Sequence, residues 1–226
     1  MKLALYGHPF SSYTWKALIP LYANDTPFEF REVSPMAGEE INGFVQSAHP
    51  AGKFPILRDG DTTVIEATSI IEYLALNHPG PSPLIPADPT EAATARMMDR
   101  VFDNYVMGAL QDLVSAYLSF TGPNRTPVVI EPDMARAEED KARLRRAYAW
   151  IEKWLGDNEL PAHVSLVSCA AAPSLFYADW VEDITDEYPR LKALRAELLA
   201  LPSVARCVDD ARPYRAYFPP GAPDRD

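Results

Sequence analysis

Apolar residues in the first third of the chain fall into short runs with two different periods. Residues 2–6 predict a first strand, and residues 28–33, in which apolar and polar side chains alternate, predict a second. Between them, Ser11 and Ser12 precede a segment whose apolar side chains recur at helical spacing. Pro20 lies inside that segment, and we expect it to kink or end the helix because proline removes one helix hydrogen bond.

Two extended runs farther along predict a hairpin. Residues 54–57 and 62–65 flank Asp59-Gly60, and an Asp-Gly pair supplies the positive φ angles that a tight hairpin turn needs. The two runs are therefore expected to pair as antiparallel strands.

A helix follows the hairpin directly and completes a domain pattern. It opens at Glu66, and its apolar residues Ile70, Ile71 and Leu74 repeat at helical spacing. Residues 38–47 are expected to form a loop or a short irregular helix. The order of strand, helix, strand, helix, hairpin and helix predicts a thioredoxin-like α/β domain. A helix that starts at a strand end also offers free N–H groups for an anion.

The rest of the chain has the period of helices. Five prolines among residues 78–89 exclude a helix or a central strand there and predict a stiff connector. Further helices are expected at residues 90–117, around 144–155, from 165, at 189–199 and at 202–210. The predicted parts are a thioredoxin-like domain at 1–77, a linker at 78–90, an all-helical domain at 91–212 and a loosely held tail at 213–226.

Composition narrows the possible partners. The 226 residues include 21 basic and 32 acidic ones, and a net charge of −11 repels nucleic acid and anionic membrane surfaces. No signal peptide and no run of about 20 apolar residues is recognised, so we expect a cytoplasmic protein without a membrane span. Cys169 and Cys207 form no disulfide framework and are expected to be buried. The histidines show no metal spacing, so no metal is expected.

Two stretches carry a family resemblance. Residues 50–57, P-A-G-K-F-P-I-L, and residues 66–74, E-A-T-S-I-I-E-Y-L, resemble the signature of the cytosolic glutathione transferases. In that family P-x-G-K-V-P-x-L contains a cis proline, and E-S-x-A-I-x-x-Y-L begins the next helix. The resemblance extends over nearly the whole chain. Ala67 stands where the family has a serine, whose hydroxyl normally holds the carboxylate of the ligand.

The resemblance also suggests a catalytic group. The run S-S-Y-T-W-K at residues 11–16 is similar to the S-S-C-x-W-R of the maleylacetoacetate isomerase-like group, whose first serine faces the sulfur of glutathione. By that motif Ser11 stabilises the thiolate, with Ser12 and Tyr6 as alternatives. From the residues alone, both serines are better explained as helix caps, and the downstream signature reverses that preference. Tyr13 replaces the cysteine of the group and Lys16 its arginine.

Further site residues follow from the same resemblance. Glu66 is expected to bind the γ-glutamyl amine, the amides of Ala67 and Thr68 its carboxylate, and His8 to line the acceptor site. The loss of one hydroxyl at Ala67 is expected to weaken glutathione binding by about 1–3 kcal/mol. The full predicted glutathione-binding set is Lys53, Phe54, Pro55, Glu66, Ala67 and Thr68.

The resemblance implies a function and leaves alternatives. It implies a homodimeric, detoxifying transferase that conjugates glutathione, its co-substrate, to small hydrophobic electrophiles. A glutathione-dependent isomerase or dehalogenase and a non-catalytic ligand-binding protein on the same fold stay open. Ser168 stands where the family has a capping aspartate, three residues after Ser165, so a weaker helix cap is expected.

Overall fold

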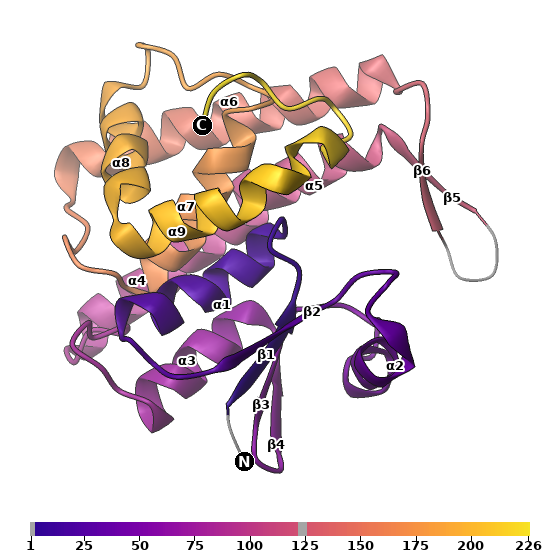
Figure 1. Ribbon diagram of the computed structural model, residues 1–226. Coiled ribbons are helices and arrows are strands. Elements are labelled where there is room, and N and C mark those ends of the chain that lie inside the picture. The colour runs from indigo at the N-terminus through magenta and orange to yellow at the C-terminus, as the bar shows by residue number, and fades with distance from the viewer. Residues whose placement is uncertain (1–2, 122–125) are drawn as a thin grey trace.

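The N-terminal part of the molecule is a small sheet covered by helices on both faces (Figure 1). The computed structural model describes residues 3–121 and 126–226. The sheet has the order β2-β1-β3-β4, with β1 and β2 parallel and the other pairs antiparallel. Its strands are β1 (Ala4–Gly7), β2 (Glu29–Glu32), β3 (Ile56–Asp59) and β4 (Thr62–Ile65).

Successive side chains along the first strand point to opposite faces of the sheet, and each face has its own hydrophobic cluster. Leu3 and Leu5 belong to the large cluster that includes residues of α1 (Ser12–Ala23) and α3 (Ala67–Asn77). Ala4 and Tyr6 point to the opposite face and pack under α2 (Gly38–Ala48). This is the period of two that a strand covered on both faces produces. The predicted thioredoxin-like arrangement is thereby confirmed.

Local details differ from the sequence predictions in a few places. The described part of the first strand begins at Ala4, and Lys2, the predicted start, lies outside the described residues. The hairpin turn consists of Gly60 and Asp61, since Asp59 still pairs with Thr62, and Gly60 has φ +59°. The segment expected to be a loop or irregular helix is the regular helix α2.

Pro20 does not end the first helix, which continues to Ala23. Leu18, Ile19 and Leu21 around it are all nearly inaccessible, with 0–2% of their surface exposed. Burial of this apolar face stabilises the last turn and outweighs the one hydrogen bond that proline removes.

The C-terminal part is built from helices, with one small hairpin that the sequence did not predict. A single predicted helix becomes α4 (Pro89–Val101), the π-helical segment η1 (Phe102–Met107) and α5 (Gly108–Ser115). The hairpin joins β5 (Leu118–Thr121) to β6 (Thr126–Val129). The other elements are α6 (Met134–Asp157), α7 (Leu166–Ala178), α8 (Pro189–Ala200), α9 (Pro202–Ala211) and the 3₁₀ helix η2 (Arg212–Tyr217).

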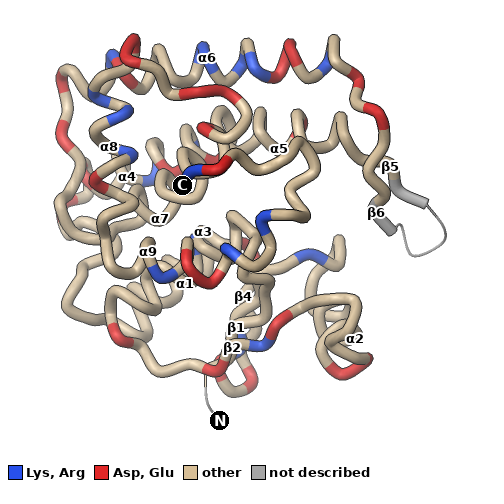
Figure 2. The backbone as a smooth tube through the Cα atoms, turned by 45° about the horizontal axis from the view of Figure 1, so that its top comes forward, with Lys and Arg blue, Asp and Glu red and all other residues tan. Residues whose placement is uncertain are grey.

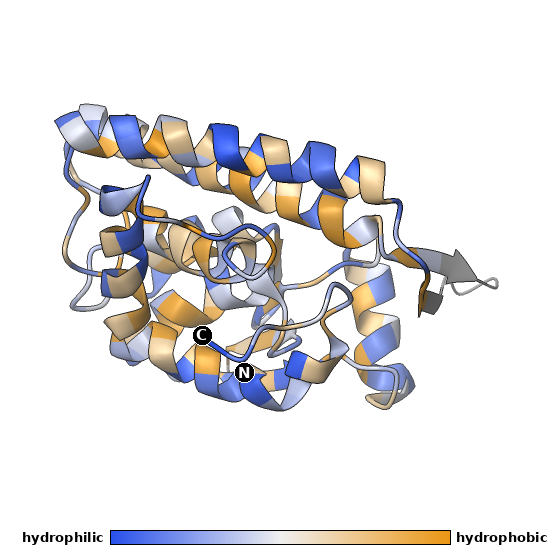
Figure 3. Ribbon diagram, turned by 90° about the horizontal axis from the view of Figure 1, so that it is seen from above, coloured by the Kyte–Doolittle hydropathy of each residue, from blue (hydrophilic) through white to orange (hydrophobic). Residues whose placement is uncertain are grey.

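Helix α7 is the centre of this part, because every one of its residues is buried. The ring of Trp15 from α1 lies 4.9 Å from that of Phe176, so α1 and α7 share one core. Both cysteines are buried there, as predicted, and burial raises the pKa of each thiol. The outer helix α6 alternates hydrophilic and hydrophobic residues (Figure 3), and basic and acidic residues are interspersed along it (Figure 2).

The C-terminal segment is packed against the molecule, and the prediction of a loosely held tail is wrong. Phe218 is 8% exposed and its ring lies 5.2 Å from that of Trp180. The Asp226 carboxylate accepts hydrogen bonds from Arg212 and Arg215. No local pattern near the C-terminus predicts these contacts, because their apolar and charged partners lie on other elements. Among the described residues, no helix is long and apolar enough to cross a membrane.

Candidate functional site

The connection from β1 to α1 presents the predicted catalytic serine. Ser11 is the N-cap of α1, and its Oγ accepts a hydrogen bond of 3.3 Å from the Thr14 N–H. A hydroxyl that accepts a bond in this way keeps its own proton for donation. Ser11 is partly exposed, whereas Ser12 is only 6% exposed inside the first turn. Of the two serines, Ser11 is therefore the one that a ligand can reach.

Tyr6, the other alternative, lies on the far face of the sheet. It is 2% exposed, its ring lies 4.4 Å from that of Phe44 in α2, and its hydroxyl accepts a bond of 3.1 Å from Arg31. This surrounding fits a role in packing. The observation favours Ser11 over Tyr6 as the hydroxyl available to a thiolate.

The start of α3 has no side-chain cap, as is also the case for α2, α8 and α9. The first turns of α1, α4 and α6 are capped by side chains of Ser11, Asp88 and Asp133. At α3 the N-cap is Glu66, with φ +68°, and its side chain makes no capping bond. The backbone N–H groups of the first turn of α3 are thus left for another acceptor. With the helix dipole, they make a site for a carboxylate.

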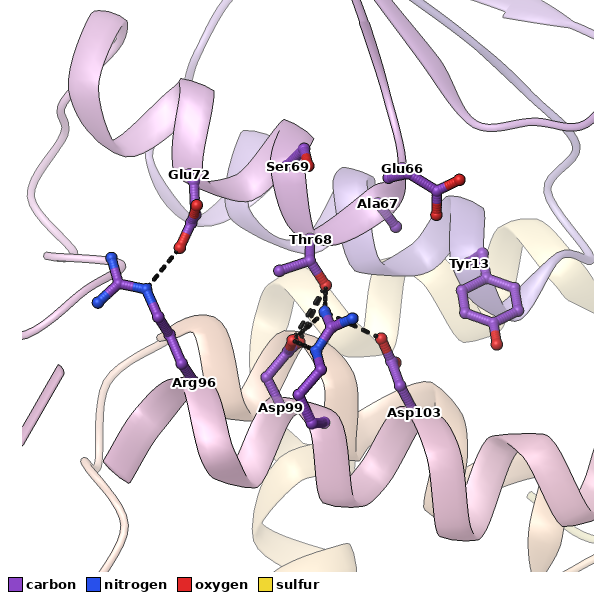
Figure 4. A pocket seen from close by; sticks show the side chains of 10 residues that line it. Tyr13, Glu66, Ala67, Thr68, Ser69, Glu72, Arg96, Asp99 and Asp103 are labelled. Atoms are coloured by element: carbon purple, nitrogen blue, oxygen red, sulfur yellow. Dashed lines mark hydrogen bonds and ion pairs between the residues drawn. The ribbon is translucent and has the colours of Figure 1, made fainter. Parts of the chain in front are cut away.

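A pocket of about 440 Å³ opens at this helix start (Figure 4). Glu66 and the Tyr13 ring stand on one side of it, while Arg96 bonds to Glu72 on the other. Acidic and basic groups therefore share one opening. The residues that line it are Tyr13, Glu66, Ala67, Thr68, Ser69, Glu72, Arg96, Asp99, Arg100 and Asp103.

A buried ion network forms the floor of this pocket. Lys16 of α1 is 1% exposed, and its Nζ donates to Asp99 Oδ1 at 2.7 Å and to Asp103 Oδ2 at 2.7 Å. The same Nζ lies 3.0 Å from Thr68 Oγ1, which in turn donates to Asp99 Oδ2 at 3.0 Å. Arg100 binds Asp99 from the solvent side. The network joins α1, α3, α4 and η1 under the candidate site.

The pKa values of two groups in and beside the network, Asp103 and Tyr13, are shifted. Burial raises the pKa of the Asp103 carboxyl, while the neighbouring Lys16 ammonium acts in the opposite direction. Burial, together with Asp103 and Glu66, raises the pKa of Tyr13 to about 12. The Tyr13 hydroxyl therefore stays protonated at neutral pH.

The structure brings only some of the predicted site residues to this pocket. Glu66, Ala67 and Thr68 line it, and the Thr68 hydroxyl is turned into the ion network. In the described part of the chain, the remaining predicted residues lie outside the pocket lining: Ser11, Lys53, Phe54, Pro55 and His8. The Phe54–Pro55 peptide bond is cis and Lys53 is exposed.

Several lining residues were missed by the sequence reasoning. Arg96, Asp99, Arg100 and Asp103 are spaced three and four apart, so they share one face of a helix. That spacing was a usable signal for a charged face turned toward the site. His49 was also missed: its Nε2 lies 3.5 Å from Glu66, and no local motif links the two.

Ser168 makes the contacts expected of a helix cap. Its Oγ accepts a bond of 2.7 Å from the Ser165 N–H and donates to the Ser165 carbonyl at 2.9 Å. A serine oxygen at this third helical position therefore reaches the N-cap backbone without an aspartate. In residues 3–121 and 126–226, no three His, Cys, Asp or Glu side chains gather in a way that could hold a metal ion.

Comparisons with known proteins agree with this architecture. Residues 5–82 match the family model of the glutathione S-transferase N-terminal domain. The chain is 27% identical to a probable maleylacetoacetate isomerase of Vibrio cholerae, across 94% of this chain and 98% of that protein.

Solved structures share the fold. Glutathione transferase F7 from Populus trichocarpa superposes with a TM-score of 0.75 at 24% identity, covering 92% of this chain and 99% of that one. Glutathione transferase URE2P8 from Phanerochaete chrysosporium, solved with oxidized glutathione, gives a TM-score of 0.79 at 18% identity, covering 94% and 96%.

Proposed function

Because the chain belongs to the cytosolic glutathione transferase superfamily, we propose that it conjugates glutathione to small hydrophobic electrophiles. Glutathione is then a co-substrate. In such a reaction the sulfur attacks the electrophilic carbon as a thiolate and the carbon–sulfur bond forms. Either the bond to the leaving group breaks and the leaving group departs with its electron pair, or a π bond opens, its pair moves to the neighbouring atom, and that atom is protonated.

Ser11 is the group that we assign to the thiolate. A free thiol with a pKa of about 8.5 is only slightly ionised at neutral pH, so a transferase must favour the thiolate. Lowering that pKa by about 2 units takes about 2.7 kcal/mol, which a charge-assisted hydrogen bond and a helix start can supply together. Ser11 caps α1 and is partly exposed, and both observations support this role.

The uncapped start of α3 is the observation that carries the proposal. A γ-glutamyl group has a carboxylate and an ammonium on one carbon, so its binding site needs both signs of charge close together. The free N–H groups at Ala67 and Thr68 suit the carboxylate, and the Glu66 and Asp103 carboxylates suit the ammonium. We propose that the rest of the peptide lies along the Phe54–Pro55 turn.

Ala67 weakens this site without removing it. The Thr68 hydroxyl is bonded to Lys16 and Asp99 and does not replace the missing serine hydroxyl. Ser69 lines the same pocket, but its side chain lies elsewhere on the first turn (Figure 4). One hydrogen bond to a charged group is lost, which corresponds to about 1–3 kcal/mol.

Calorimetric titration with glutathione tests the binding site. We expect the wild type to bind, Ala67→Ser to bind more tightly, and Glu66→Gln to bind more weakly. Ser11→Ala should retain binding while losing most turnover of a chloronitrobenzene substrate. No binding heat in the wild type and in Ala67→Ser would contradict the proposal and favour a non-catalytic ligand-binding protein on the same fold.

A second candidate reaction is glutathione-dependent isomerisation. It is favoured by the similarity to the probable maleylacetoacetate isomerase along nearly its whole length. Here glutathione adds to a carbon–carbon double bond, rotation follows, and elimination returns the thiolate. Turnover of maleylacetone by the wild type, lost in Ser11→Ala, would support it; absence of turnover in an enzyme that conjugates would exclude it.

A homodimer in the cytoplasm belongs to the same proposal. Sedimentation of the purified protein would give the state of association, and a monomer that conjugates glutathione would refute that part alone.

A further inference from the structure

The loop that presents Ser11 is held by one imidazole. His8 Nδ1 accepts a bond of 3.1 Å from the Phe10 N–H, and the His8 carbonyl accepts one of 2.9 Å from the Ser11 N–H. The His8 N–H itself donates to Thr14 Oγ1 at 3.3 Å. The side chain of His8 thus bonds to Phe10, which precedes the serine, and the backbone of His8 bonds to Ser11 itself and to Thr14.

The other polar groups of the loop have neutral partners. The Pro9 carbonyl accepts a bond of 2.7 Å from Trp15 Nε1, and the Phe10 carbonyl accepts one of 3.0 Å from the Tyr177 hydroxyl. Among the side chains that hold the loop, only an imidazole changes its charge near neutral pH.

Two distant segments hold the imidazole in turn. Glu32 of β2 lies 4.0 Å from His8 Nε2, and the Tyr214 ring of η2 stands edge-on to the imidazole at 4.6 Å between centroids. The Tyr214 hydroxyl donates to Glu32 at 3.2 Å. In Figure 1 the C-terminal segment passes beside the loop between β1 and α1. In the described chain, Glu32 and Tyr214 are the ionisable groups that face this ring.

These bonds define a protonation state. Since Nδ1 accepts from Phe10, the ring proton of neutral His8 is on Nε2, directed toward Glu32. A second proton would sit on Nδ1 and face the Phe10 N–H, so two donors would oppose each other. Burial lowers the pKa of His8, and Glu32 acts against that change, so the ring is neutral at pH 7.

We propose that His8, oriented by Glu32 and Tyr214, is a positioning residue that fixes Ser11 through the Phe10 amide and releases it when the imidazole becomes protonated. The inference rests on the proposed function of Ser11. It gives the C-terminal segment a role at the active site that neither sequence motif contains.

Replacing His8 by asparagine or by glutamine, whose side-chain amides differ in length by one carbon, tests the bond from the Phe10 N–H. In His8→Asn the side-chain oxygen accepts from the N–H two residues ahead, the bond of an Asx turn, so most turnover should remain. In His8→Gln the side-chain oxygen lies one carbon farther from the backbone, so its geometry for accepting from the Phe10 N–H is poor. We expect His8→Gln and His8→Ala to lower kcat about fivefold, with little change in KM for glutathione.

The thiol of bound glutathione provides a readout that a general loss of packing would not move. Thiolate absorbance measured against pH should give a higher pKa for the bound thiol in His8→Gln than in the wild type, and an unchanged one in His8→Asn. Equal values in wild type and His8→Gln would overturn the inference. Thermal unfolding of each variant checks that the fold is retained.

A double-substitution cycle separates this inference from the proposed function. If Ser11→Ala leaves the thiol pKa and turnover unchanged, the proposed role of Ser11 fails. If Ser11→Ala has its effect, His8→Gln should add almost nothing in that background, because it acts through Ser11. Full additivity would refute the positioning role while leaving the transferase intact.

The dependence on pH completes the test. Turnover of the wild type at saturating glutathione should fall as the pH drops below 6.5, the ordinary pKa of histidine, beyond the fall caused by protonation of the bound thiol. His8→Asn should lose this extra component. Its persistence in His8→Asn would assign it to another group and contradict the inference.

Discussion

Substitution of Lys16 by methionine is expected to reveal the largest single stabilising contact under the candidate site. The change keeps the length and apolar stem of the side chain and removes the ammonium. Asp99 and Asp103 then lose a donor at 2.7 Å each in a place where their side chains are only 1% and 11% exposed.

The expected loss in the free energy of unfolding depends on which charged groups still contact the Asp99 and Asp103 carboxylates after the substitution. Removing one partner of a buried ion pair costs about 3–5 kcal/mol. Arg100 still binds Asp99 and lies 3.5 Å from Asp103, so we expect a value near the lower end, about 3 kcal/mol. For a chain of this size that lowers Tm by about 6–12 °C.

The loss should depend on pH with a definite sign. The pKa of Asp103 is already raised by burial, and Lys16 opposes that rise. Without Lys16 the folded-state pKa rises further, so the native state binds more protons than the unfolded state up to a higher pH. Stability then falls as pH rises through that range. The difference between wild type and Lys16→Met should therefore be larger at pH 7.5 than at pH 5.

Denaturant unfolding at both pH values measures these differences. Lys16→Arg, which keeps a positive charge, is the matched control and should retain most of the stability. Lys16→Met combined with Asp103→Asn should recover part of the loss, since a buried charge is removed with its partner. A loss below about 1 kcal/mol, equal at both pH values, would refute this account of the network.

Three further outcomes follow from single contacts. Ser168→Ala should lower the free energy of unfolding by about 1 kcal/mol, measured by urea unfolding, and leave glutathione affinity unchanged. Tyr13 should titrate only at about pH 12, seen as phenolate absorbance that is missing in Tyr13→Phe. The bond from His78 lowers the pKa of Asp59, so this pair contributes stability above pH 3.8 that is lost as the pH falls through the lowered pKa. In His78→Gln the free energy of unfolding should therefore fall less than in the wild type as the pH is lowered.

Elements defined by neighbouring residues could be predicted from the sequence. The hairpin follows from Asp59-Gly60 between two extended runs, and the cis bond at Phe54–Pro55 lies in a motif that specifies it. The start of α1 at Ser11 likewise depends on a bond within three residues. Each of these signals comes from residues only a few positions apart, so it can be recognised in a single sequence.

Contacts between distant segments could not be predicted in the same way. Lys16 bonds to residues 52, 83 and 87 positions away, and nothing near it in sequence marks it as buried. Tyr214 and Glu32 are 182 residues apart. The proline-rich composition of the C-terminal end predicts a loose tail, yet the Phe218 ring packs against aromatic rings of other elements.

Three of the departures from the family pattern, at Ala67, Lys16 and Ser168, have different physical outcomes. Ser168 keeps the cap because a short hydroxyl still reaches the N-cap backbone. Lys16 keeps the charge, but a compact ammonium has no fixed fork of donors, and here it is surrounded by Asp99, Asp103 and the Thr68 hydroxyl. That arrangement commits Thr68 to the network, so the hydroxyl missing at Ala67 has no substitute beside it. The lysine and the alanine are therefore linked, because Lys16 and Asp99 bond the Thr68 hydroxyl next to the proposed glutathione site, where Ala67 supplies no hydroxyl.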